Sequence, residues 1–205
     1  MVSPFFSLEN QSLDNQADIF LLRLQSQDGT NRLTQQRVQA LQEIVGTISA
    51  QALPLVIAGN TSFFSVGAEL QEISELDGPS AYEFSKMGQA LMGMIDQFPA
   101  PVFAAIEGYC MGGGLDLALA CHHRIASPHA VFGHRGATLG LITGWGGTQR
   151  FPRLIGKGRA LEMFVAAEKV TATQALQMGL VDAIAQDPVA EALRRALATQ
   201  RNLPR

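Results

Sequence analysis

Short apolar runs alternate with amphipathic stretches along this 205-residue chain. Leu55–Ala58 and Val102–Ile106 have the length and apolar character of buried strands, and residues 19–24 form a third such run. Thr34 can cap a helix that extends to about Ser49, because the apolar residues that follow it recur on one helical face. This alternation predicts an α/β core with parallel strand pairing and right-handed crossovers.

The rest of the pattern predicts further elements within a single domain, with a core over about 15–186 and a short C-terminal helix over about 188–199. Other helices are expected over 68–76, 79–98, 157–167 and 173–178, and extended segments over 123–126, 130–133 and 181–185. Residues 59–67 are expected to form a loop whose two phenylalanines, Phe63 and Phe64, line a pocket or fold onto the core. The methionines of the helix over 79–98 are expected to be ordinary core residues.

Residues 100–121 carry the strongest candidate site. The run Val102–Ile106 leads to a turn at Gly108, to three consecutive glycines at 112–114, and to an apolar helix over 115–120. A glycine-rich turn at a helix start presents unpaired N–H groups and the positive end of the helix dipole, which together hold a phosphate, a carboxylate or a developing oxyanion. Asp116 lies three residues after Gly113 and projects over the same side of the first turn.

An N–H group that stabilises negative charge and a carboxylate that moves a proton form a candidate catalytic pair. The alternative is a tight strand-to-helix turn with an acidic residue that favours the helix dipole.

Composition and charge exclude several classes of function. Apolar residues make up 47% of the chain and charged residues 16%, and 18 acidic against 15 basic residues give a net charge of −3 without a basic block. We therefore expect no nucleic-acid or membrane partner. There is no secretory signal pattern and no apolar run of about 20 residues that could span a bilayer. Cys110 and Cys121 form neither a disulfide framework nor a metal-ligand pattern, so a cytoplasmic protein with reduced thiols and no metal is expected.

Four motifs occur in a fixed order along the chain. They are FSVGAEL at 64–70, GYCMGGGLDL at 108–117, the segment 132–150 that ends in GWGGTQR, and ALQMGLVD at 175–182. In this order they resemble the crotonase superfamily, the enoyl-CoA hydratase/isomerase family, over roughly residues 19–185. The resemblance implies a spiral of ββα repeats, here with a shortened C-terminal helical region, and assembly into a homotrimer or a hexamer.

The resemblance also implies a type of reaction. Members of the family act on acyl thioesters of coenzyme A through an enolate-like intermediate, with coenzyme A as part of the substrate and no separate cofactor. The thioester oxygen is held by two backbone N–H groups, which fall on Ala68 and Gly113. The adjoining substrate-binding positions fall on Val66, Gly67 and Gly112, and the turn that contacts pantetheine falls on Gly29.

The two acids of the family's hydratases are not both present. The first falls on Asp116, and the second falls on Gly136, which has no side chain. The position that some isomerases use instead falls near Gly144, which has no side chain either. Dihydroxynaphthoyl-CoA synthases also have glycine at the place of Gly136, where a bound bicarbonate can be the base, but the aspartate that they carry near Thr143 is missing. Two-carboxylate hydration is therefore not expected.

Several residues near Gly136 offer other chemistry. His134 could act as an acid or a base and Arg135 could pair with a substrate carboxylate, the alternative for each being a surface or packing role. Thr143 and Trp145 are candidate acyl-pocket residues, with core packing as the alternative. The histidines at 122 and 123 follow the central helix and are expected to be structural.

Two other features depart from the family pattern. Asp28 stands where many relatives have a basic residue before the pantetheine turn, and relatives usually continue for several dozen residues beyond the position of Arg205. A more open pocket, an altered trimer or a shortened product is expected. An acyl group on a carrier protein is the alternative to free coenzyme A.

Together these features predict a crotonase-fold enzyme that stabilises an enolate at Ala68 and Gly113 and moves a proton with Asp116. Isomerisation, decarboxylation of a malonyl-type thioester and hydrolysis all fit a single carboxylate. The rival prediction is a non-catalytic member that binds acyl-CoA or contributes to an assembly. A protease is not expected, because no Ser-His-Asp arrangement coincides with the motifs.

Overall fold

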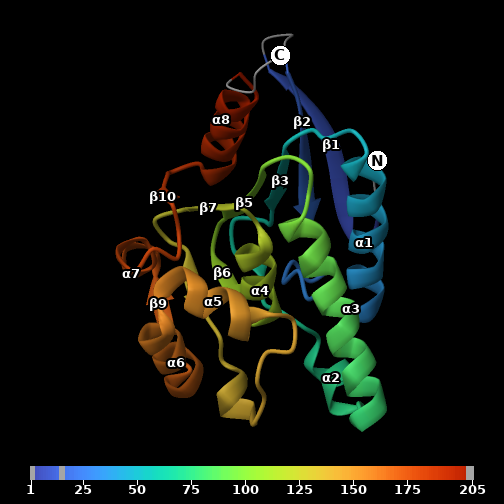
Figure 1. Cartoon of the computed structure of the whole chain (residues 1–205), viewed down its shortest axis with the longest axis vertical. Helices are drawn as coiled ribbons and strands as arrows, with labels where there is room; N and C mark the ends of the chain where they lie inside the picture. The colour runs from blue at the N-terminus through green and yellow to red at the C-terminus, as the bar shows by residue number, and fades with distance from the viewer. Residues whose placement is uncertain (1–2, 14–16, 202–205) are drawn as a thin grey trace.

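The computed structural model describes residues 3–13 and 17–201 and contains two β-sheets flanked by helices (Figure 1). The larger sheet has the strand order β1-β2-β3-β5-β7-β10 and the smaller one β4-β6-β8-β9. The strands are β1 (Phe6–Leu13), β2 (Ala17–Leu24), β3 (Leu55–Ala58), β4 (Phe63–Ser65), β5 (Val102–Ile106), β6 (Tyr109–Met111), β7 (His123–Ala126), β8 (Val131–Gly133), β9 (Lys169–Thr171) and β10 (Ala183–Ile184). The helices are α1 (Gln35–Ser49), α2 (Leu70–Ser74), α3 (Gly78–Asp96), α4 (Gly113–Ala120), the 3₁₀ helix η1 (Gly136–Leu139), α5 (Gly147–Ile155), α6 (Lys157–Ala166), α7 (Ala172–Gln177) and α8 (Pro188–Arg201).

From β3 to β8, successive strands along the chain alternate between the two sheets. β3, β5 and β7 pair in parallel in the larger sheet, and the strands that follow each of them, β4, β6 and β8, pair in parallel in the smaller sheet. Each pair of strands leads into helix, so the chain advances by one strand in each sheet per repeat. The expected α/β spiral of ββα repeats is confirmed.

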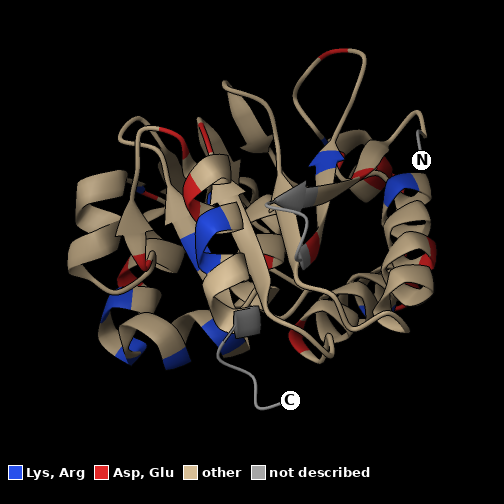
Figure 2. Cartoon of the chain, turned by 90° about the horizontal axis from the view of Figure 1, so that it is seen from above, with Lys and Arg blue, Asp and Glu red and all other residues tan. Residues whose placement is uncertain are grey.

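Both faces of the larger sheet are covered. In β2, Ile19 and Leu21 belong to the apolar cluster under α8, whereas the alternate residues Phe20 and Leu22 belong to the main core with α1 and α3. Alternation of side chains along a strand places them on opposite faces. Because both faces of the central strands are buried, β3 and β5 are apolar throughout, as parallel strands of α/β proteins usually are, whereas the edge strand β1 carries exposed polar residues. Figure 2 shows acidic and basic positions scattered over several helices and loops.

The expected elements differ from the observed ones in the glycine-rich parts of the chain and at the strands β1 and β9. The segment 59–67 was expected to be a loop, but it contains β4, in which Phe64 is fully buried in the core. β1, β6, β9 and α5 were not expected, and α8 continues to Arg201, beyond the expected end at 199. Short strands such as β6 have too few residues to show an apolar–polar alternation. Helix α5 is hard to predict because it begins at a Gly-Gly pair and contains Pro152, and both are typical of loops.

Candidate active site

A cavity of about 740 Å³ opens between α2, α3, the start of α4 and the segment 134–145. Its lining is mainly apolar and includes Leu70, Ile73, Leu76, Phe84, Leu139, Leu141, Ile142 and Trp145. Ile142 at its edge is 75% exposed. Cavities of this size and character take small organic molecules or the acyl part of a larger one. We call it the catalytic cavity.

Two backbone N–H groups of the catalytic cavity lie close together. A Cβ atom built on Gly113 would lie 3.3 Å from the nitrogen of Ala68, and one built on Gly67 would lie 2.8 Å from the nitrogen of Gly113. Neither N–H donates to an acceptor among the described residues, and Gly113 is the first residue of α4, where helix N–H groups lack intrahelical partners. The fold therefore brings together the two backbone nitrogens that the resemblance assigns as oxyanion donors, and that role stays a prediction.

The loop that carries Ala68 is held by buried polar residues. Asn31 is fully buried with a φ of 54°, and its Nδ2 donates to the carbonyl oxygens of Phe63 and Phe64 at 3.1 and 3.2 Å. Ser65 Oγ donates to the Asn31 carbonyl and accepts from the Gly67 N–H at 3.1 Å. We did not single out Asn31 and Ser65 from the sequence. The only sequence signal was an asparagine in a turn, a residue that tolerates the left-handed conformation.

Asp116 is the one acidic residue among the described residues that line the catalytic cavity, and it is 2% exposed. Its Oδ1 lies 3.1 Å from Nε2 of His134, and its Oδ2 accepts a hydrogen bond from the Thr143 hydroxyl. A carboxylate only accepts hydrogen bonds, so its contact with His134 requires a proton on Nε2. The fold thus joins three residues that the sequence analysis treated separately.

The carboxylate of Asp116 lies at the N-terminal ends of two helices. It belongs to the first turn of α4, and the first residue of α5, Gly147, lies directly beside it. A Cβ atom on Gly147 would lie 2.1 Å from Oδ1 of Asp116, so any side chain there would displace the carboxylate. Two helix N-termini favour negative charge at this point.

His134 is 5% exposed, and its ring packs edge-on against Phe164 with centroids 5.2 Å apart. The surface alternative for His134 is therefore wrong. Arg135 is exposed, lines the catalytic cavity and forms no ion pair with a described residue.

Position 136 has no room for a second acid. A Cβ atom on Gly136 would lie 2.8 Å from the carbonyl oxygen of Leu141, and the Leu141 N–H donates to the Gly136 carbonyl at 2.9 Å. The segment 136–141 is therefore folded back so that the Leu141 backbone occupies the space into which a side chain at position 136 would extend.

The other predicted binding residues fall into two groups. Val66, Gly112, Thr143 and Trp145 line the catalytic cavity, together with Gly136. Gly29 and Gly67 are not among the lining residues; each has a positive φ, and Gly67 brings the Ala68 loop against α4.

The turn before Thr30 is organised by Asp28. Hydrogen bonds from the side chains of Ser26 and Thr30 and from the Thr30 backbone lower the pKa of Asp28 to about 2. Asp28 also pairs with Arg32 at 2.8 Å, and Arg32 lies 3.6 Å from Glu69. Thr30 and Arg32 line the catalytic cavity, so this turn forms one side of its entrance.

The remaining candidate groups are structural. His122 Nδ1 accepts from the Val102 N–H at 2.8 Å, and burial lowers the pKa of His123. Cys110 and Cys121 are buried free thiols; burial raises the pKa of both, that of Cys121 to about 12. Within the described part of the chain, no three His, Cys, Asp or Glu residues converge as metal ligands, and no helix could cross a membrane.

Comparison with known proteins agrees with the fold and identifies the family. The family model for enoyl-CoA hydratase/isomerase matches residues 14–204. The chain belongs to this family.

Among its relatives, a Bacillus subtilis (strain 168) protein named "Probable enoyl-CoA hydratase" is 43% identical over 145 residues, which are 70% of this chain and 56% of the relative. The crotonyl-CoA hydratase of Syntrophomonas wolfei is 32% identical over 181 residues, which are 87% of this chain and 70% of that protein. This member of the family therefore spans little more than half of the Bacillus relative's length.

Solved structures confirm the fold. The crystal structure of an enoyl-CoA hydratase from Bacillus anthracis superposes with a TM-score of 0.89 at 32% identity, over 97% of this chain and 77% of that one. Pseudomonas aeruginosa DspI superposes with a TM-score of 0.91 at 29% identity, over 98% and 77%.

Proposed function

We propose that this family member acts on an acyl-CoA thioester and moves a double bond or a proton next to the thioester by single-carboxylate chemistry. The observation that carries the proposal is the pair of unoccupied N–H groups of Ala68 and Gly113 beside Asp116, the one lining carboxylate among the described residues. The thioester oxygen accepts hydrogen bonds from both N–H groups. The negative charge that develops on this oxygen in the enolate is stabilised by the N-terminus of α4.

Asp116 then takes the proton from the carbon next to the thioester and returns it to the same carbon or to the γ carbon. Thr143 and His134 hold the carboxylate in place, because each of its oxygens has one of them as a partner. Returning the proton to another carbon moves the double bond, which is isomerisation and needs no second acid. No cofactor beyond the coenzyme A of the substrate is needed, and a homotrimer or hexamer is the proposed assembly.

Decarboxylation of a malonyl-type thioester is a second candidate, favoured by Arg135. This guanidinium lines the catalytic cavity without an ion pair to a described residue, so it can hold the carboxylate that leaves as carbon dioxide. The same oxyanion donors would stabilise the enolate that remains.

A substrate panel tests the proposal. The chain is incubated with 2-enoyl-, 3-enoyl-, malonyl- and methylmalonyl-CoA, and the products are identified by mass spectrometry and by the absorbance of the conjugated thioester. Conversion between 2- and 3-enoyl-CoA with little hydration supports isomerisation, and carbon dioxide release supports decarboxylation. Binding without any turnover contradicts catalysis and supports the rival role of acyl-CoA binding.

Replacement of Gly113 by proline is a poor probe of the oxyanion donor. A Cβ atom at this position would lie 2.6 Å from Cζ3 of Trp145, so the substitution would displace the indole as well as remove the N–H. The isosteric Asp116→Asn variant is cleaner, since it keeps the volume of the side chain.

A further inference from the structure

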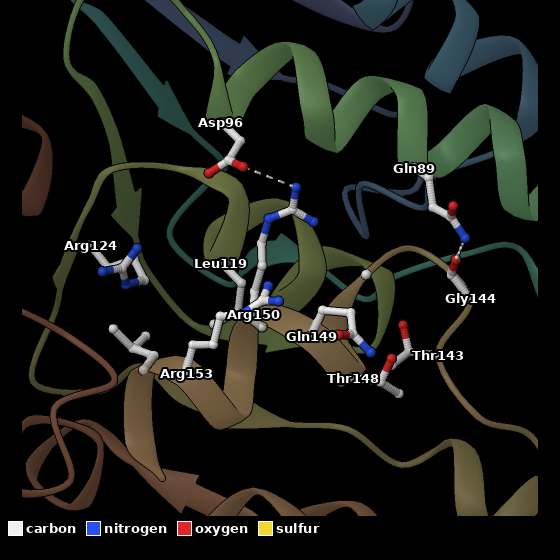
Figure 3. A pocket seen from close by; sticks show the side chains of 12 residues that line it. Gln89, Asp96, Leu119, Arg124, Thr143, Gly144, Thr148, Gln149, Arg150 and Arg153 are labelled. Carbon is white, nitrogen blue, oxygen red and sulfur yellow. Dashed lines mark hydrogen bonds and ion pairs between the residues drawn. The ribbon is translucent and has the colours of Figure 1, made fainter. Parts of the chain in front are cut away.

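A second cavity of about 740 Å³ lies along the segment 143–146 and shares only Thr143 and Gly144 with the lining of the catalytic cavity. It is bounded by the C-terminal half of α3, the end of α4, β7 and the outer face of α5 (Figure 3). Three arginines line it: Arg124 of β7, and Arg150 and Arg153 of α5. We call it the arginine cavity. Gln89 Nε2 donates a hydrogen bond to the Gly144 carbonyl at 2.7 Å and so links α3 to the segment 143–146.

The positive charge of the arginine cavity is only partly compensated. Arg124 already has partners: its Nε donates a hydrogen bond to the Leu180 carbonyl at 2.8 Å, and its guanidinium forms an ion pair with Asp182 at 3.7 Å. Arg153 is exposed and has no ion pair with a described residue. Asp96 is the acid that lines the cavity.

Arg150 is the residue that most needs a further partner. Its side chain crosses the cavity from α5 to Asp96, where one terminal nitrogen lies 3.4 Å from the carboxylate (Figure 3). Its Nε is buried and has no hydrogen-bond partner among the described residues. A guanidinium can hold an oxyanion through two N–H groups at once. Because Nε is buried, a ligand in the cavity would be held by the terminal nitrogens, of which the long contact with Asp96 uses one.

We infer that the arginine cavity is a binding site for a small organic anion, whose carboxylate or phosphate group is held between Arg150 and Arg153. These residues lie three apart on one helix and therefore point to the same side. Thr148, Gln149 and Gln89 line the same space and can bond the polar remainder of the ligand. The volume is in the range of small-molecule sites. The inference does not depend on the proposed reaction, since it concerns a different cavity.

The single tryptophan of the chain offers a direct readout. Trp145 is 3% exposed, and its neighbours Gly144 and Gly146 both line the arginine cavity. Citrate and pyrophosphate, as probes of the carboxylate and phosphate classes, are titrated at constant ionic strength while tryptophan emission is recorded, with calorimetry in parallel. Saturable binding of either probe is expected, and the tighter one identifies the class of anion.

Variants decide where the probe binds. Arg153→Gln is expected to raise the half-saturating concentration roughly tenfold or more, and Arg150→Lys to raise it as well. The matched control Arg159→Gln, an exposed arginine outside both cavities, should leave it unchanged. The inference is overturned if neither probe saturates by either readout, if Arg159→Gln weakens binding as much as Arg153→Gln, or if only Arg135→Gln, in the catalytic cavity, weakens it.

Discussion

At the residue scale, Gly136 carries the prediction that hydration with two carboxylates is closed to this protein. The side chain that a second acid would need is excluded by the Leu141 carbonyl, and the hydrogen bond between the two backbones keeps the segment folded. Position 136 therefore lies against folded backbone, and not beside an empty space into which a glutamate would fit.

Restoring a glutamate should fail for this reason. Gly136→Glu is expected to destabilise the fold by about 1–3 kcal/mol, as overpacked sites do, and to leave crotonyl-CoA hydration at its original level. Urea unfolding and a hydration assay measure the two effects, with Gly136→Ala as the matched control for the steric part. A gain in hydration of roughly 10²-fold or more would show that the segment opens and that the missing acid alone limits the reaction.

Asp28 is a second residue whose chemistry can be tested in isolation. Its folded pKa of about 2 lies below the ordinary value of 3.8 because hydrogen bonds from Ser26 and Thr30 favour the charged form. A depressed pKa contributes stability that is present above the ordinary value and is lost as the pH falls from about 4 to about 2.

Asp28→Asn should lower the free energy of unfolding at pH 7 by less than about 1 kcal/mol, because this carboxylate is largely exposed and screened by solvent. The difference from the unchanged chain should vanish as the pH falls toward 2, which denaturant unfolding at several pH values would show. A difference that persisted unchanged at pH 2 would mean that the charge of Asp28 contributes nothing to the turn.

At the scale of elements, α3 and α4 are linked through Trp145. The indole donates from Nε1 to the Phe84 carbonyl at 3.3 Å, packs on the backbone of Gly88 in α3, and abuts Gly113 at the start of α4. A Cβ atom on Gly88 would lie 2.1 Å from the ring. The position of Gly113, the proposed oxyanion donor, therefore depends on the packing of the tryptophan against α3.

Gly88→Ala should push the indole toward Gly113, lower the turnover number more than it changes KM, and destabilise the fold by about 1–3 kcal/mol. The matched control is Gly93→Ala on the same helix, where a Cβ atom would meet nothing within 4 Å. That control should keep full activity and gain about 0.5–1 kcal/mol, because alanine is the better helix former. Equal behaviour of the two variants would refute the link between α3 and the oxyanion donor.

The sequence predicts the elements and the site best where an apolar run is unbroken or where several candidate residues lie within one helical turn. β3 and β5 have the predicted bounds because each is a wholly apolar run, and Gly113 and Asp116 were identified because they share one helix turn. The contacts among Asp116, His134 and Thr143 could not be predicted from spacing, since 18 and 27 residues separate Asp116 from its two partners. Only the third repeat of the spiral, which returns the chain to the start of α4, brings them together.

At the scale of the whole molecule, two apolar clusters enclose the larger sheet, and both cysteines lie in the main one. Burial raises the pKa of each thiol, so the reactive thiolate is scarce at neutral pH. In the native protein, Cys110 and Cys121 should not react with Ellman's reagent on the timescale of minutes, and both should react at once in denaturant. Rapid reaction of a thiol in the native protein would contradict the packing of the core around α4.

The most direct test of the proposed chemistry is hydrogen exchange into the substrate. The protein and its Asp116→Asn variant are incubated with acyl-CoA and enoyl-CoA thioesters in deuterated water, and the mass of the recovered thioester is measured. We predict deuterium at the α or γ carbon with the unchanged protein and a loss of roughly 10²–10⁴-fold in the variant, the usual contribution of a positioned acid–base group. Equal exchange in both proteins would contradict the role of Asp116, and no exchange in either, despite binding, would contradict enolate chemistry altogether.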